Sequence, residues 1–224
     1  MMINIKFFGL ILLLATLLGL GGCTREIDEQ DASIAGIDKI SDPYFDVIST
    51  ASYNYTTYDI YDVFVLPPDK NDLKFAAPGH GNWALRKDQK KWELNGGGAS
   101  LAWDPKWTLP KKFKIWWLRV VDKAIFTSSG PAYDKYTTKE ARAGSAWCEG
   151  EILVQHGPRR NRKSYLIVHF FPDGHIEGDV DYSGEVVSRV DVTKRFELPV
   201  LRERACLKQI ENPYFGKPKP IDMY

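Results

Sequence analysis

The chain has 224 residues, of which 44% are hydrophobic and 13% aromatic, and its formal net charge is +1. This length suits one packed domain. The near-neutral charge gives no basis for nucleic-acid binding or for a surface-wide electrostatic attraction to membranes.

The first 22 residues have the pattern of a secretory signal peptide. Lys6 is the only charged residue before Arg25, and an apolar stretch follows it over residues 7–20. A basic start, a short apolar stretch and small residues at the cleavage point are typical of such signals. The stretch is shorter than the roughly 20 apolar residues that span a bilayer. Its removal takes away one lysine and no acid, so the remaining chain has a formal net charge of zero.

The end of this segment, Leu20-Gly21-Gly22-Cys23, resembles the bacterial lipobox. The resemblance implies cleavage before Cys23, which then carries a diacylglycerol thioether and an acylated amino group. Several acyl chains anchor a protein stably, whereas a single chain binds only marginally. Thr24 favours the outer membrane, facing the periplasm, because lipoproteins of the inner membrane often carry Asp there. The alternative is an ordinary signal peptide in which Cys23 is incidental.

Residues 23–41 then form the lipidated N-terminus and a polar, acid-leaning tether. Fully stretched, this tether reaches roughly 60 Å. From residue 42 onward the composition is typical of strands, with many Tyr, Val, Ile and Thr residues in partial alternation. Strands are predicted within 44–56, 58–66, 99–103, 113–122 and 147–155, with long loops between them and one helical turn near 139–142.

The segment 164–183 has the clearest pattern in the chain. Pro172-Asp173-Gly174 predicts a type I turn with the glycine in the left-handed position, which pairs Phe171 with His175. Alternation then predicts two faces of the hairpin. The core face holds Leu166, Val168, Phe170, Ile176 and Val180, and the face toward solvent or a partner holds His169, Glu177, Asp179 and Asp181.

Beyond the hairpin the pattern weakens. Residues 186–192 are predicted as a further strand, and 196–210 fit either a strand or a short helix. We therefore place a β-rich domain at 42–212 and an extended C-terminal tail, packed or mobile, at 213–224. Many short strands separated by turns indicate a mainly β protein with a single antiparallel β-sandwich-like domain and long loops.

Two cysteines, Cys148 and Cys206, remain once Cys23 is assigned to the lipid. An oxidising compartment favours a disulfide between them. On the chain-entropy account it is worth about 4 kcal/mol. The alternative is a pair of buried free thiols.

The sequence contains no pattern that indicates an enzyme, a cofactor or a metal site. The run Gly96-Gly97-Gly98 lacks the Lys-Ser/Thr pair of a phosphate loop, and is better explained as the start of a strand or a bulge. No HExxH or GxSxG motif occurs. A zinc site at His169 and His175 is conceivable, but the hairpin register makes His169 and Glu177 a simple cross-strand pair.

Three features suggest binding instead. The acidic row Glu177, Asp179 and Asp181 is either a surface for a basic partner or merely solvated. The basic loop with Arg159, Arg160 and Arg162 either contacts phosphates or lipid head groups or is an ordinary charged loop. Trp116 and Trp117 must point to opposite faces of a strand, so one is expected in the core and the other lies under a loop or forms an exposed anchor for a partner.

Several motifs occur in an order that resembles a family of small Gram-negative lipoproteins known as a domain of unknown function. These motifs are Tyr53-Asn54-Tyr55-Thr56, the glycine run 96–98, the Trp pair after a Leu-Pro turn, and LIVHFFPDG at 166–174. The resemblance covers residues 44–210. It implies an immunity protein that binds and neutralises a phospholipase effector of type VI secretion, and it supplies no catalytic residues. The alternative is a structural or assembly lipoprotein of the envelope.

Overall fold

The computed structural model describes residues 46–79, 81–84, 89–128, 133–159, 162–182, 187–194, 197 and 206–218. The chain divides between Ser41 and Asp42 into two units, and every described residue lies in the second. The predicted signal peptide, the lipidation site Cys23 and the tether 23–41 therefore lie outside the described residues. Within them, no helix has the length and apolar character needed to cross a membrane.

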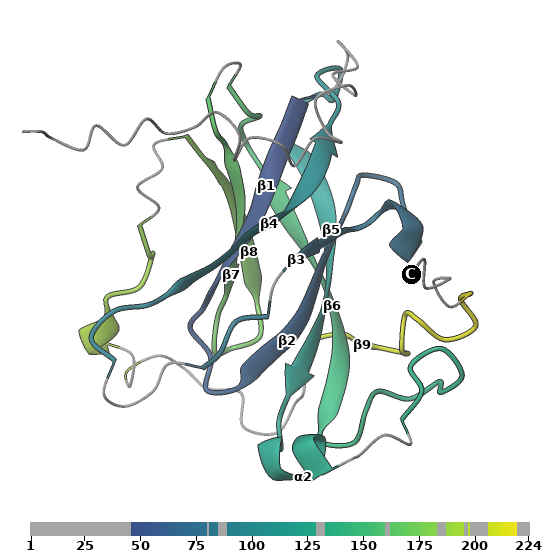
Figure 1. Ribbon diagram of the computed structural model, residues 1–224. Helices are drawn as coiled ribbons and strands as arrows, with labels where there is room; N and C mark the ends of the chain where they lie inside the picture. Colours follow the sequence, from purple (N-terminus) through teal and green to yellow (C-terminus); the bar gives the residue numbers. More distant parts are fainter. Residues whose placement is uncertain are drawn as a thin grey trace, which may run out of the picture. The chain divides into compact units, whose positions relative to one another are not determined.

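The described residues fold mainly into strands (Figure 1). In chain order the elements are β1 (Asp46–Asn54), β2 (Asp59–Leu66), the 3-10 turn η2 (Leu73–Phe75), β3 (Ala77–Gly79), β4 (Leu94–Trp103), β5 (Lys111–Val120), α2 (Lys123–Ser128), β6 (Ser145–Val154), β7 (Tyr165–Phe170), β8 (Ile176–Asp181), η3 (Val192–Lys194) and β9 (Gln209–Ile210).

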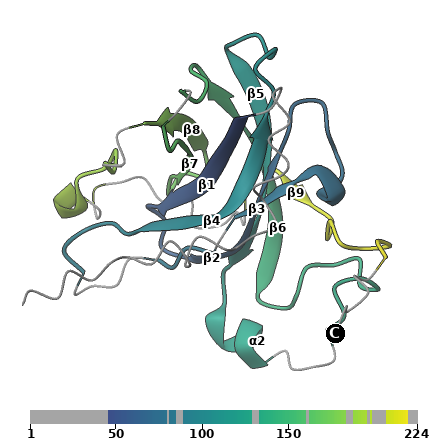
Figure 2. The ribbon, with the colours of Figure 1, turned by 45° about the horizontal axis from the view of Figure 1, so that its top comes forward.

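The strands form two sheets packed face to face. Sheet A has the order β4-β1-β7-β8 and sheet B the order β3-β2-β5-β6-β9. The layers are visible in Figures 1 and 2, where β1 and β7 lie across from β2, β5 and β6. This confirms the predicted mainly β, sandwich-like class. The antiparallel prediction needs one correction, because β1 and β7 pair in parallel.

Alternation along β5 explains how the inner core forms. Phe113, Ile115 and Trp117 point between the sheets and are buried. They meet Ile48 of β1 and Phe170 of β7 in one apolar cluster that contains residues of both sheets. Side chains at alternate positions share a face of a strand, so the apolar residues of β5 with this spacing hold the layers together.

The β7–β8 hairpin has the predicted register. The backbone N–H of Phe171 donates to the His175 carbonyl at 3.1 Å, and Gly174 has a φ of 88°. His169 pairs with Glu177, and Phe170 pairs with Ile176. The predicted core face of the hairpin is also confirmed, since its residues join the inner core.

The glycine run lies within β4, where it meets an irregularity in β1. Ser49 pairs with Ser100 and Ala51 pairs with Gly96. Between these two pairs β1 advances by two residues and β4 by four, so β4 bulges there. Gly96 has a φ of 136°, and a Cβ there would lie 2.6 Å from the Ala51 Cα. Only glycine fits this backbone, which supports the bulge explanation over a phosphate loop.

Both outer faces of the sandwich are covered. Residues 187–194 lie over sheet A, where Val190 joins a cluster around Tyr55 and Trp92. The predicted strand at 186–192 is therefore wrong for its described part, which runs irregularly into η3 and contributes packing rather than strand pairing. Sheet B is covered by α2 and by residues near 141, 210 and 214. The helical turn expected at 139–142 is absent and those residues form bends and irregular chain.

A disulfide joins Cys148 of β6 to Cys206, with a Cα–Cα distance of 5.5 Å. It holds the C-terminal segment against the edge of sheet B, where β9 pairs with β6. The segment continues with Tyr214, whose ring contacts those of Phe64 and Trp147. The described part of the tail, 213–218, is therefore packed on the domain.

Candidate binding surface around α2

Four large apolar side chains are exposed around α2. They are Tyr61, Trp83, Val121 and Ile125, each between 44% and 57% exposed. We call this set the α2 surface. Val121 and Ile125 lie just before and within α2, the ring of Tyr61 contacts Phe126 at 5.1 Å, and the Lys123 ammonium lies 5.3 Å from the centre of the Trp83 ring.

The local sequence explains why Ile125 faces outward. β5 ends at Val120, and the N–H groups of Val121 and Asp122 both donate to the Gly144 carbonyl. The Asp122 carboxylate then accepts the Ile125 N–H at 3.1 Å, as an N-cap does. Phe126 enters the outer cluster of sheet B. Its neighbour Ile125 consequently points away from the sheet, because successive helix residues are about 100° apart.

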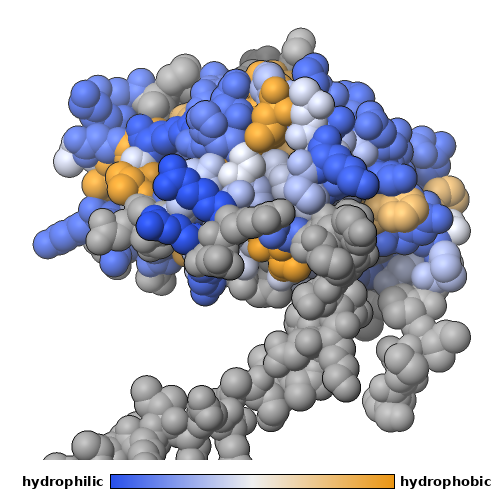
Figure 3. Space-filling model, turned by 90° about the horizontal axis from the view of Figure 1, so that it is seen from above, coloured by the Kyte–Doolittle hydropathy of each residue, from blue (hydrophilic) through white to orange (hydrophobic). Residues whose placement is uncertain are grey.

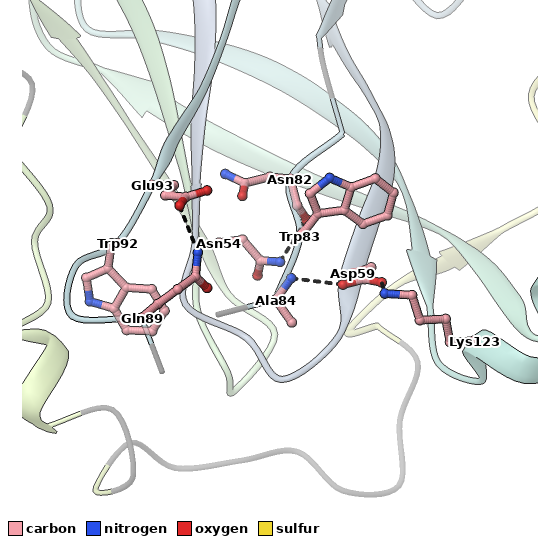
Figure 4. Close-up of a pocket in the computed structure, with 9 residues that line it drawn as sticks. All are labelled: Asn54, Asp59, Asn82, Trp83, Ala84, Gln89, Trp92, Glu93 and Lys123. Carbon is pink, nitrogen blue, oxygen red and sulfur yellow. Dashed lines mark hydrogen bonds and ion pairs between the residues drawn. The ribbon is translucent and has the colours of Figure 1, made fainter. Parts of the chain in front are cut away.

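A cavity of about 240 Å³ borders this surface (Figure 4). We call it the Asn–Trp pocket, and its lining is Asn54, Asp59, Asn82, Trp83, Ala84, Gln89, Trp92, Glu93 and Lys123. Figure 4 shows Trp92 and Trp83 on opposite sides, with Asn54 and Asn82 between them. The lining comes from the ends of β1 and β2, from the segments before β4 and from the start of α2.

The floor of the pocket is held by buried hydrogen bonds. Asn54 donates to the carbonyls of Tyr58 and Asn82 at 2.8 and 3.0 Å and accepts two hydrogen bonds from Thr56. The backbone of Asn82 pairs with Ile60. Asp59 accepts the Ala84 N–H at 2.9 Å and forms an ion pair with Lys123 at 2.7 Å. Asn54 and Asp59 are therefore structural supports of the pocket.

A second cavity, of about 330 Å³, lies on the other side of α2 over sheet B. Tyr61, Phe126 and Tyr214 are among its walls, and Asp62 also lines it. Burial raises the pKa of Asp62, and the Lys135 ammonium opposes that shift. The Lys135 ammonium itself lies 3.9 Å from the centre of the Tyr214 ring. The α2 surface is thus flanked by two hollows.

The acidic row predicted for binding has a partner within the chain. Arg189 pairs with Glu177 and, at 3.2 Å, with Asp179. The face was predicted to be solvated or to meet a basic partner. Both carboxylates remain about half exposed, and Arg189 of the segment 187–194 supplies a cation from within the chain. Like charges on one strand face repel, and a single guanidinium between two of them relieves that repulsion. Asp181 ends β8 beside them.

His169, predicted on the same exposed face, is only 2% exposed. Tyr53 and Tyr55 stack beside its ring, and the Tyr55 hydroxyl lies 2.8 Å from its Nδ1. Burial, together with a smaller effect of the nearby Arg189 guanidinium, lowers the pKa of His169 to about 4, while Asp179 acts in the opposite direction. Among the described residues no cluster of His, Cys, Asp and Glu has a metal-binding arrangement.

Neither tryptophan of β5 is an exposed anchor. Trp117 is buried between the sheets, so its predicted binding role is wrong. Trp116 is half-buried on the outer face of sheet B, and its indole N–H donates to Glu149 at 2.8 Å. The outer-face cluster covers the ring, which fits the alternative of a tryptophan packed beneath neighbouring segments.

Two of the three arginines of the basic loop are described. The Arg159 guanidinium lies 4.5 Å from the centre of the Tyr182 ring, and Arg162 is exposed. Arg160 lies outside the described residues. The loop therefore presents at least one exposed cation, and the stacking of Arg159 on Tyr182 gives that residue a structural contact as well.

Comparisons with family models, curated proteins and solved structures gave no match to this chain. The site is therefore interpreted from its own geometry. The α2 surface was not predicted from the sequence, although one local signal was present. Asp122 can cap a helix, and the pair Ile125-Phe126 that follows must divide between a buried and an exposed side.

Proposed function

We propose that the protein is a membrane-anchored, periplasm-facing lipoprotein that binds and neutralises a secreted antibacterial phospholipase. The resemblance over residues 44–210 suggests the phospholipase, and the lipobox ending at Cys23 suggests the anchor. The observation that supports binding most directly is the α2 surface, with four large apolar side chains that remain exposed.

The composition of the α2 surface is that of an interaction site. Trp and Tyr are the residues over-represented where truncation costs an interface most. Scattered exposed apolar residues are normal, whereas several of them gathered around one element suggest a partner. Figure 3 shows the end of the sandwich away from α2, where the coloured side chains are mostly hydrophilic and the apolar ones form separate patches. We therefore place the partner at the α2 end.

A lipid anchor would help the protein to neutralise a phospholipase by holding it close to the membrane on which that enzyme acts. A phospholipase acts at a membrane, and a tether with a reach of roughly 60 Å keeps the inhibitor near the same surface. Local confinement raises the effective concentration of one binding partner for the other. Loss of palmitate labelling in a Cys23→Ser variant tests the anchor independently of the partner.

The partner is tested by affinity capture from the native envelope, followed by mass spectrometry. We expect one stoichiometric phospholipase, lost with Ile125→Asp because a charge then enters an apolar contact. Val47→Asp is the matched control, since Val47 is also an exposed apolar residue but lies at the start of β1, away from Asn54 and the pocket.

The captured phospholipase is then expressed in the periplasm of cells with and without the protein. Growth rescued by the wild type and by Val47→Asp, but not by Ile125→Asp, supports the proposal. Capture of envelope assembly proteins, or a phospholipase whose toxicity is unaffected, refutes immunity. The first of these outcomes favours the alternative of a structural or assembly lipoprotein.

A further inference from the structure

We infer that the Asn–Trp pocket is a binding site for a neutral oligosaccharide. The inference is independent of the proposed partner, because it rests on the lining of the pocket and not on the apolar α2 surface as a whole. Three properties support it: a hydrogen-bond acceptor that no described residue uses, a pair of aromatic walls, and described lining residues without a surplus of positive charge.

Asn82 supplies a hydrogen-bond acceptor, its side-chain oxygen, that no described residue uses. Its Nδ2 donates to the Ser52 carbonyl at 2.8 Å, and because a carbonyl only accepts, this fixes the orientation of the amide. Its Oδ1 lines the pocket with no hydrogen bond from any described residue, although the side chain is only 4% exposed. This oxygen is not one of the enclosed polar atoms that lack a partner, so solvent or a ligand can reach it from the cavity. A ligand hydroxyl would satisfy it.

Glu93 adds a second acceptor on the rim. One of its carboxylate oxygens accepts the Gln89 side-chain N–H at 2.8 Å, and this bond positions the group. The other oxygen has no hydrogen-bond donor among the described residues. Acceptors therefore converge from the floor and the rim on a single cavity. This arrangement suits a ligand that is rich in O–H donors.

The two tryptophans provide the apolar part of the site. Trp92 is buried and its ring is held edge-on against Tyr55 at 5.0 Å, so that wall is rigid. Trp83 on the other side is 57% exposed, which is unusual for a side chain that buries 150–250 Å² in cores. The C–H face of a sugar ring packs well on an indole, because the negative π-face attracts partly positive hydrogens.

The charged residues of the lining favour some classes of polar ligand over others. Among the described residues, the charged groups that line the pocket are Asp59, Glu93 and Lys123, and Asp59 and Lys123 form an ion pair. Phosphorylated or sulfated ligands need a surplus of Arg or Lys, which these described lining residues do not provide. A neutral hexose or N-acetylhexosamine chain therefore fits better than an acidic glycan.

The test titrates the full chain, purified in detergent, with three neutral probes: tri-N-acetylchitotriose, maltotriose and cellotriose. Tryptophan fluorescence and saturation-transfer NMR report binding, with no protein partner present. We expect at least one probe to bind, about tenfold more weakly to Trp83→Ala and several-fold more weakly to Glu93→Gln. Trp116→Phe is the matched control, since Trp116 lies on the outer face of sheet B away from this lining.

Thermal unfolding of each variant shows whether it is folded; both altered side chains are exposed, so we expect little change. Binding that is weakened by both pocket changes and unaffected by Trp116→Phe supports the site. Absence of binding by all three probes at millimolar concentration overturns the inference, as does equal binding by Trp83→Ala and Glu93→Gln. Neither result bears on the proposed phospholipase partner, which is tested separately by the affinity-capture experiment.

Discussion

Stability should fall in mild acid because of one buried histidine. His169 of β7 is enclosed by aromatic rings and by residues 187–194. The Tyr55 hydroxyl accepts the backbone N–H of Arg189 at 2.9 Å, and its oxygen lies 2.8 Å from the His169 Nδ1. The enclosed position of the ring disfavours the charged imidazolium, because burial removes the water that would solvate it. The Arg189 guanidinium also disfavours a second positive charge there.

The size of the effect follows from the pKa of His169, which changes from 6.5 to about 4 on folding. Above pH 6.5 the imidazole is neutral in both states. Below it the unfolded chain binds a proton that the folded protein excludes, so the free energy of unfolding falls by about 1.4 kcal/mol per pH unit. The decline ends near pH 4, where the folded protein is protonated too. The total loss is about 3 kcal/mol.

The assay is urea unfolding of the oxidised protein between pH 7 and pH 4, for the wild type and for His169→Gln. Glutamine keeps an acceptor for Tyr55 but does not titrate. Carboxylates contribute equally to both curves, so the wild type should lose about 3 kcal/mol more than the variant over this range. His175→Gln, at a half-exposed site in the same hairpin, is the control for replacing a histidine by glutamine. Parallel curves for wild type and His169→Gln would refute the reasoning.

Two further predictions concern the covalent link and the backbone. Replacing Cys148 and Cys206 with alanine should lower the free energy of unfolding by about 4 kcal/mol, because the unfolded chain is no longer closed into a long loop. Urea unfolding measures this change. An unchanged midpoint would show that the disulfide does not form. Gly96→Ala should cost several kcal/mol, because its Cβ meets the Ala51 Cα at 2.6 Å. Gly216→Ala, also at positive φ but with open space around it, should cost only about 1 kcal/mol, and equal losses would contradict the steric argument.

The parts of the fold that follow from local signals could be predicted from the sequence. The β7–β8 hairpin is an example, since Pro172-Asp173-Gly174 sets the turn and alternation then sets the faces. The strands β1, β2, β5 and β6 were likewise recognisable from their composition, whereas β3 and the first half of β4 were not. The parallel pairing of β1 with β7 was not, because it joins segments more than 100 residues apart with no turn between them to specify the register.

The surroundings of His169 show why a correct register did not give correct burial. Its position opposite Glu177 was predicted, but the segment that covers it has no strand or helix period. Val190 and the backbone of Arg189 reach this face through contacts such as the one to Tyr55, 134 residues away. The alternation of side chains along a strand identifies the two faces of a sheet. It does not show whether a later segment of the chain covers the outer face.

The same contacts show why the acidic row is a weaker candidate for partner binding than the α2 surface that we propose. Glu177 and Asp179 form a conspicuous row in the sequence, yet Arg189 pairs with both in the folded domain. An acidic row on a strand needs a nearby cation to limit repulsion, and a chain that is neutral overall has one to supply. Ile125 and Trp83 do not stand out in the sequence as a charged row does. Both side chains remain exposed in the folded domain, so a partner that buried them would gain the free energy of removing apolar surface from water. A partner should therefore gain more at the α2 surface than at the acidic strand.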